Sequence, residues 1–277
     1  MTDQAKQQLK KTANTVRMDI IEQVHSAKSG HPGGSLSIAD IVTYLYFAEL
    51  NIDPKNPDWD GRDRFVLSKG HTCPALYSAL ARRGYFDPAI LPTFRQIGSI
   101  LQGHPDMKHI PGVDMSSGSL GQGISAACGM ALAAKKTGAS YRVYTALGDG
   151  EIEEGQVWEA LMFAAHYKLD NLCVIVDSNG LQIDGPVDEV MGSAPIAAKA
   201  EAFGLHAIEI DGHNFDEIES AFNEAKKQNK PTLIVAKTVK GKGVSFMENQ
   251  VGWHGTAPND EQYEIAMTEL KEAAKCL

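Results

Sequence analysis

Acidic and amide side chains follow two apolar segments of this sequence, each within a glycine-containing turn. Gly148-Asp149-Gly150 comes directly after the apolar run 143–147, and Asn179 comes soon after the run 172–176. One helix and one strand fit between these turns, so a parallel β-α-β unit would place both at neighbouring strand ends. Carboxylate and amide oxygens are hard ligands for Mg²⁺, which leaves coordination positions for water, a backbone carbonyl and phosphate oxygens. The spacing therefore indicates a cation and phosphate site.

A simpler interpretation of the same turns stays open. Asp149 would cap a helix that begins near Glu151, and Asn179-Gly180 would form an ordinary turn, because Asp, Asn and Gly are the commonest turn residues. In either case glycine lets the backbone approach a ligand closely, and a helix N-terminus favours negative charge.

Histidines form a second group of candidates. Of the nine in the chain, five directly adjoin glycine: His31, His71, His104, His213 and His254. Neutral imidazoles can move protons near pH 7 or hydrogen-bond a sugar hydroxyl or a phosphate, although a single loop histidine is as readily a surface residue. His213 is assigned to the start of a helix at Asn214 and is given no role in a site.

Other glycine-containing segments carry weaker signals. The segment 117–123 precedes an alanine-rich helix and could bring backbone close to a flat ligand. The basic segment 237–243 does not match the GxxxxGK[ST] phosphate loop, and no GxSxG elbow occurs, which argues against an ATPase and a serine hydrolase.

Composition excludes several classes of protein. The chain has 277 residues, 43% of them hydrophobic, and 26 basic against 35 acidic residues give a formal charge of -9. This balance argues against a surface built for nucleic acid or anionic lipid. The N-terminus is polar, and no segment has the roughly 18 apolar residues of a membrane helix. The four cysteines show no CxxC pairing, so we expect a reducing, cytoplasmic protein with neither disulfides nor a zinc cage.

These residues must be positioned by the elements around them. Short apolar runs predict strands at 65–67, 143–147, 172–176, 206–210 and 232–236. Helical spacing predicts helices at 3–29, from about Ser37 to Tyr46, 74–83, 121–136, 154–167, 194–203, 215–228 and 259–275. Continuous apolar strands between helices are typical of a doubly wound α/β fold, a mainly parallel sheet with helices on both faces. We expect a single domain over residues 1–277.

Taken together, the segments resemble the thiamine-diphosphate-dependent enzymes and, within them, the N-terminal half of transketolase. The matching segments run in the family's order over nearly the whole chain. They are Ser29-Gly30-His31-Pro32-Gly33, Asn56 to Trp59, Arg62 to Ser68 with Gly70-His71, Gly103-His104-Pro105, Gly118 to Gly123, Gly148-Asp149-Gly150 with Glu153-Glu154-Gly155, Asn179 with Ile183-Asp184-Gly185, and His254-Gly255.

The resemblance implies a cofactor, thiamine diphosphate, and a metal ion that binds its diphosphate. Asp149, Asn179 and the backbone carbonyl of Leu181 would hold Mg²⁺, or another divalent cation such as Ca²⁺ or Mn²⁺. The diphosphate would also contact Gly150, His71 and His254.

It further implies which residues serve the reaction, the transfer of a two-carbon ketol unit from a ketose phosphate to an aldose phosphate. His31, His104, His254 and Glu154 would be catalytic: His31 and His104 line the substrate channel, and Glu154 joins an acid network between subunits. Gly118 and Leu120 would lie beside the aminopyrimidine of the cofactor.

Three departures from the family pattern stand out. Ser119 replaces a common Pro, and Lys69 replaces a common Asn, which adds a charge near the diphosphate. The chain also stops near Leu277, without the pyrimidine-binding and C-terminal domains of a full transketolase. We therefore expect a split enzyme in which a second chain carries those domains, as a dimer of heterodimers, with no nucleic acid or membrane as partner.

Two alternatives remain. The chain could be the diphosphate-binding subunit of another enzyme with the same cofactor, a 2-oxoacid dehydrogenase or a sugar-phosphate synthase, or a noncatalytic scaffold. The loop histidines favour sugar-hydroxyl recognition over binding of a small 2-oxoacid, and a scaffold has no physical need for Asp149, Glu154 and Asn179.

Overall fold

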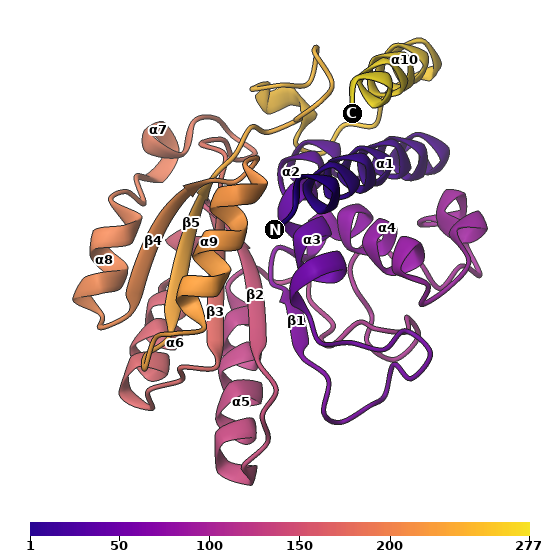
Figure 1. Ribbon diagram of the computed structural model, residues 1–277. Coiled ribbons are helices and arrows are strands. Elements are labelled where there is room, and N and C mark those ends of the chain that lie inside the picture. The colour runs from indigo at the N-terminus through magenta and orange to yellow at the C-terminus, as the bar shows by residue number, and fades with distance from the viewer.

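Five parallel strands form the centre of the computed structural model, which describes residues 1–277 (Figure 1). The strands are β1 (Arg64–Leu67), β2 (Val143–Gly148), β3 (Leu172–Ser178), β4 (His206–Asp211) and β5 (Thr232–Lys237). Their order in the sheet is β1-β2-β3-β5-β4, and every neighbouring pair is parallel. All five predicted strands are confirmed, with ends that shift by one or two residues.

Ten α-helices surround the sheet. They are α1 (Asp3–Ala27), α2 (Pro32–Ser37), α3 (Ala39–Tyr44), α4 (Cys73–Arg83), α5 (Gln122–Thr137), α6 (Gly155–His166), α7 (Val187–Met191), α8 (Ile196–Ala202), α9 (Phe215–Ala225) and α10 (Asp260–Cys276). A π-turn spans Leu45–Glu49, and short 3₁₀ turns span Gly70–Thr72, Pro88–Thr93, Glu151–Glu153 and Val251–Trp253. None of the helices is both long and apolar enough to cross a membrane.

The two faces of the sheet are covered by different helices. Phe65, Tyr144 and Ile175 face a core shared with α1, α3, α4 and α9. Val66 and Val174 face a second core, shared with α5, α6 and α8. In β1, β2, β3 and β5 successive residues alternate between two buried faces, so these strands are mostly apolar and show no period-two pattern, whereas the edge strand β4 is partly exposed. The doubly wound α/β fold is thus confirmed.

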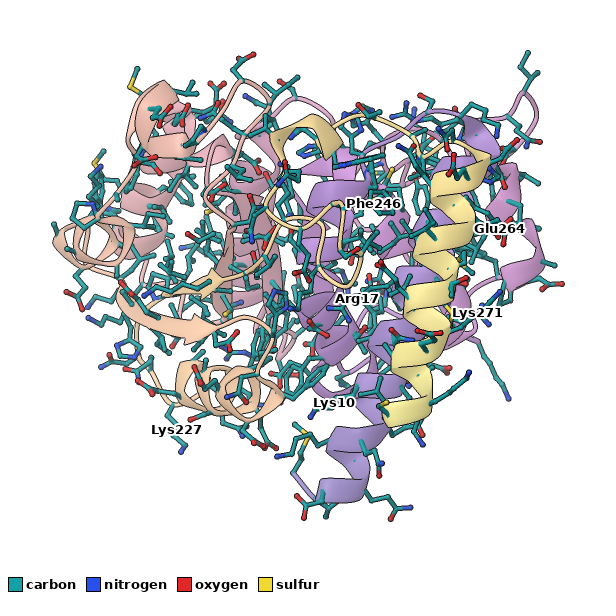
Figure 2. All side chains as sticks on the ribbon, turned by 90° about the horizontal axis from the view of Figure 1, so that it is seen from above. Lys10, Arg17, Lys227, Phe246, Glu264 and Lys271 are labelled. Atoms are coloured by element: carbon teal, nitrogen blue, oxygen red, sulfur yellow. The ribbon has the colours of Figure 1, made fainter.

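The last helix, α10, lies against the first. The Asn14 amide of α1 donates to the carbonyl of Leu270 at 2.8 Å, and a capping box of Asn259 and Gln262 starts α10. Figure 2 shows Arg17 between α10 and the loop that carries Phe246. Arg17 forms a buried ion pair with Asp40 of α3, so α1 is joined to its neighbours by polar as well as apolar contacts.

Three local predictions are wrong. The helix α2 has no counterpart among the predicted helices, although the fixed φ of Pro32 suits a first helical position; the helix expected from about Ser37 is α3 with the π-turn that follows it. A 3₁₀ turn follows Gly148-Asp149-Gly150, and the α-helix starts only at Gly155. The five-residue helix α7 has no counterpart among the predicted helices, since it is too short to show a helical period.

Candidate functional site

A cavity of about 300 Å³ lies at the carboxyl ends of β1, β2 and β3. Its walls combine glycines, histidines and charged groups that come from the turns after these strands and from the segments 31–34 and 240–254. The lining residues are His31, Gly34, Lys69, His71, Gly118, Leu120, Gly148, Asp149, Gly150, Glu151, Asn179, Leu181, Gln182, Ile183, Lys240 and His254. This is the place where ligands bind in doubly wound folds.

The three expected metal ligands lie together in this wall. The Asp149 carboxylate is nearly buried and accepts hydrogen bonds from the backbone N–H groups of Gly150, at 3.0 Å, and Gly180, at 2.6 Å. The second of these bonds joins the turn after β2 to the turn after β3, next to Asn179. Burial raises the pKa of Asp149 to about 6, and the nearby charge of Asp177 also raises it.

The donor set fits a hard cation with few protein ligands. The carbonyl of Leu181 accepts a hydrogen bond from the Lys240 ammonium at 3.1 Å, so this oxygen already faces a positive charge. No group of three or more His, Cys, Asp or Glu side chains is arranged to hold a metal ion. One carboxylate, one amide and one carbonyl therefore suit Mg²⁺ completed by water and phosphate oxygens better than they suit a closed zinc site.

Lys69 forms an ion pair with Asp177 beneath the cavity. Both side chains are almost completely buried, and Lys69 also donates to the carbonyl of Gly34 at 3.2 Å. Burial alone would raise the pKa of Asp177, but the Lys69 ammonium holds it below its usual value. The charge that Lys69 adds to the site is thus neutralised within the protein.

Asp177 also orients the Asn179 amide. The Nδ2 group of Asn179 points to the Asp177 carboxylate at 3.3 Å, which turns the oxygen Oδ1 of the amide away from it. That oxygen accepts from the N–H of Leu181 at 3.2 Å. An oxygen that faces the turn can serve a cation, whereas the NH₂ group cannot.

Lys240 is the second buried lysine of the cavity, and it pairs with no carboxylate. Its ammonium donates to Leu181 and to Nδ1 of His254, at 3.1 and 3.0 Å. Burial lowers the pKa of Lys240 to about 8, and the positive charge of Lys69 adds to this shift. A buried cation without a counter-charge is costly unless an anion binds beside it.

Three histidines line one side of the cavity. The ring centroids of His31, His71 and His254 lie 5.1 to 5.5 Å apart. Because Nδ1 of His254 accepts from Lys240, Nε2 carries its proton and is the ring's donor. Nδ1 of His31 is buried and has no hydrogen-bond partner in the protein, which is typical of a group that awaits a ligand.

The environment keeps these histidines neutral at pH 7. Burial, with a contribution from Arg95, lowers the pKa of His31 to about 4. Burial, followed by the charge of Lys240, lowers the pKa of His254 to about 3, and burial also lowers the pKa of His71 well below its usual value. The rings therefore act as hydrogen-bond donors and acceptors and contribute no positive charge to the cavity.

Two of the predicted residues lie outside the lining. His104 is exposed at the mouth, where its ring carbons are 3.6 Å from the position that a Cβ on Gly118 would take. Glu154 is exposed at the N-terminus of α6, beside Gly121. Gly121 has φ +78°, and a Cβ there would lie 2.9 Å from Cβ of Glu154, so this turn requires glycine.

Sequence reasoning missed several lining residues. Lys240 lies in a basic segment that is noted only because it does not match an ATPase loop. Gln182 carries no signal of its own, and Ile183 is noted only within the segment Ile183-Asp184-Gly185 that resembles the family. Glu151, expected as the first residue of a helix, instead accepts hydrogen bonds from Ser68 and from the N–H groups of Gly121 and Gly148. It thereby joins the ends of β1 and β2 to the start of α5.

The family model that matches the chain is described as transketolase, thiamine diphosphate binding domain, and it covers residues 8–273. A 6-deoxy-6-sulfo-D-fructose transketolase subunit of Clostridium sp. (strain MSTE9) is 47% identical over 95% of this chain and 96% of its own length. One of the apulose-4-phosphate transketolase subunits of Phocaeicola vulgatus is 43% identical, over 92% of this chain and 91% of its own.

Longer proteins match as well. Rattus norvegicus transketolase is 47% identical over 91% of this chain, which spans 40% of that protein. The solved structure of transketolase from Campylobacter jejuni has a TM-score of 0.91 and 38% identity over 99% of this chain and 43% of its own. The chain is thus similar to the whole of some relatives and to about two fifths of others.

The two buried lysines should differ in their effect on stability. Lys69→Met leaves Asp177 buried without its counter-ion, so we expect the free energy of unfolding to fall by about 3 to 5 kcal/mol. Lys240→Met removes a buried charge that has no carboxylate partner, so we expect a change of less than about 1 kcal/mol. Urea denaturation of the ligand-free chain at pH 7 measures both, and equal losses would contradict this assignment of charges.

Proposed function

This chain belongs to the transketolase family, and we propose that it is the diphosphate-binding subunit of a split transketolase whose cavity holds thiamine diphosphate and a divalent cation. The observation that carries the proposal is the meeting of Asp149, Asn179 and the Leu181 carbonyl in one wall of a cavity whose other wall is formed by His31, His71 and His254. The relatives matched over nearly their whole length are named as transketolase subunits, which supports a divided enzyme. In this account residues 1–277 form a single domain, and four unpaired cysteines are consistent with a cytoplasmic enzyme.

Asp149, Asn179 and the Leu181 carbonyl would hold the cation, Mg²⁺ or a similar ion, against the diphosphate. Gly150 allows close approach of its backbone, His71 and His254 supply hydrogen-bond donors, and Lys240, which contacts both Leu181 and His254, supplies positive charge. Gly118 and Leu120, exposed at the mouth, would lie beside the aminopyrimidine. When bound, thiamine diphosphate supplies the carbanion chemistry that breaks and forms the carbon–carbon bond.

The histidines would hydrogen-bond the sugar substrate and accept its protons. With its Nδ1 buried and unpartnered, His31 can accept a hydrogen bond from a hydroxyl, and His104 at the mouth can donate to one or accept from one. Because both rings are neutral, they can also accept a proton as charge develops on a sugar oxygen. We propose a phosphorylated or otherwise anionic ketose as donor and an aldose phosphate as acceptor.

A partner chain would bind the face that contains Leu120, Glu154 and the outer side of α6. That helix exposes Met162 and Phe163, Tyr167 follows at its end, and Leu120 lies close to the mouth of the cavity. Exposed apolar side chains of this size are typical of an interface. The partner would carry the pyrimidine-binding and C-terminal domains, in a dimer of heterodimers, with Glu154 in an acid network across the contact.

Cofactor binding should require a divalent cation and Asp149. The diphosphate is strongly anionic, so without metal it would meet the Asp149 carboxylate directly. We expect Asp149→Ala and excess chelator each to abolish binding of thiamine diphosphate to the complex in calorimetric titration. Glu209→Ala, an exposed carboxylate on the edge strand β4, is the matched control. Equal affinity with and without chelator would refute the metal assignment.

Transketolase turnover should appear only when the partner chain is added. The cavity of this chain provides groups mainly for the diphosphate end of the cofactor, with only Gly118 and Leu120 beside the aminopyrimidine, and two copies of the chain would present two diphosphate sites. The assay uses Mg²⁺, thiamine diphosphate, an aldose phosphate and a donor panel of xylulose 5-phosphate, fructose 6-phosphate, 6-deoxy-6-sulfofructose and apulose 4-phosphate. Robust turnover by the chain alone would contradict the proposal, and the preferred donor would identify the substrate.

A further inference from the structure

The loop that presents His104 is held from below by two side chains of α4. The Tyr77 hydroxyl lies 2.8 Å from the carbonyl oxygen of Gln102 and 2.9 Å from that of His104. The Cys73 thiol, one helical turn earlier on the same face, donates to the carbonyl of Gly103 at 3.2 Å. Three successive carbonyls therefore turn toward α4.

Tyr77 and Cys73 are the only donors to these carbonyls in the protein. Both side chains are completely buried, so water does not replace them. Burial raises the pKa of the Cys73 thiol to about 12 and raises the pKa of Tyr77 as well. Both groups consequently keep their protons, and remain donors, over the whole range in which an enzyme works.

The position of the carbonyls determines where the imidazole lies. With the backbone turned toward α4, the His104 ring lies on the opposite side of the loop, against Gly118 at the mouth of the cavity. Gly103 is packed against Arg95: a Cβ on Gly103 would lie 2.8 Å from Nε of that side chain. The loop is thus fixed on two sides, and a peptide rotation near Gly103 would move the imidazole.

We propose that Tyr77, assisted by Cys73, is a positioning residue that fixes the His104 imidazole for contact with the sugar; this inference rests on the proposed function for the role of His104. Tyr77 is absent from the lining of the cavity, so it acts through the carbonyls of Gln102 and His104, while Cys73 holds that of Gly103. The Tyr77 hydroxyl restricts the backbone of a loop that makes few other hydrogen bonds. Such a restriction would assist the reaction only if the His104 imidazole must be held in one orientation.

A double-mutant cycle tests the proposal in the complex with the partner chain. Tyr77→Phe keeps the buried ring and removes the hydroxyl, and we expect kcat/KM for the ketose donor to fall about tenfold while the affinity for thiamine diphosphate stays unchanged. In a His104→Ala background the same change should alter kcat/KM less than about twofold, because the group that it positions is gone. Equal losses in both backgrounds would overturn the proposal and indicate a general structural role.

The matched control is Tyr141→Phe, which also removes a phenol hydrogen bond to a backbone carbonyl, that of Met130, outside the site. It should leave kcat/KM unchanged. A loss equal to that of Tyr77→Phe would again point to a general effect.

A measurement on the chain alone separates this inference from the proposed function. In NMR spectra of the chain with isotope-labelled histidine, His104→Ala identifies the His104 ring signals. Tyr77→Phe should shift or broaden those signals and leave the signals of His213, which is held by Asp40, unchanged. Unaltered His104 signals would overturn the proposal even if the complex proves to be a transketolase, and altered signals would support it even if the complex shows no turnover.

Discussion

A buried ion pair at the carboxyl edge of the sheet is the interaction on which the site depends. Lys69 follows β1 and Asp177 belongs to β3, so the pair reaches across the end of β2, the strand that Asp149 follows. Ser37 of α2 and Thr238, after β5, donate to the same carboxylate, which draws four parts of the chain to one point. Removing two charges from water is costly, and only the full set of partners around Asp177 offsets that cost.

The pair also decides which charges reach the cavity. Asp177 neutralises the charge of Lys69 and orients the Asn179 amide. Lys240 is then the one buried lysine of the cavity that has no carboxylate partner. Neutral histidines complete the lining. Cation ligands, neutral histidine donors and a buried ammonium in one cavity suit an anionic diphosphate that is bound together with a metal. In the proposed function, the partner chain would cover the exposed glycine turn at the mouth and the apolar side chains of α6.

Periodicity and turn chemistry in the sequence were sufficient for the five strands, most helices and the edge of the sheet where the site lies. They could not reveal Lys240 or the Lys69–Asp177 pair, because a lysine buried against a distant carboxylate has no local signature. They also missed α2, where two glycines weaken the helical pattern although Pro32 begins it well. The hydrogen bonds from Tyr77 and Cys73 to the carbonyls of residues 102–104 depend on tertiary packing, so the sequence could not reveal them either.

We propose that this chain by itself binds the diphosphate end of the cofactor and that its partner binds most of the pyrimidine end. Calorimetric titration of the isolated chain with inorganic pyrophosphate and with unphosphorylated thiamine, each with Mg²⁺ and with chelator, tests it most directly. We expect pyrophosphate to bind only with Mg²⁺ and thiamine not to bind. Binding of thiamine with an affinity equal to that of pyrophosphate, or of pyrophosphate without metal, would contradict it.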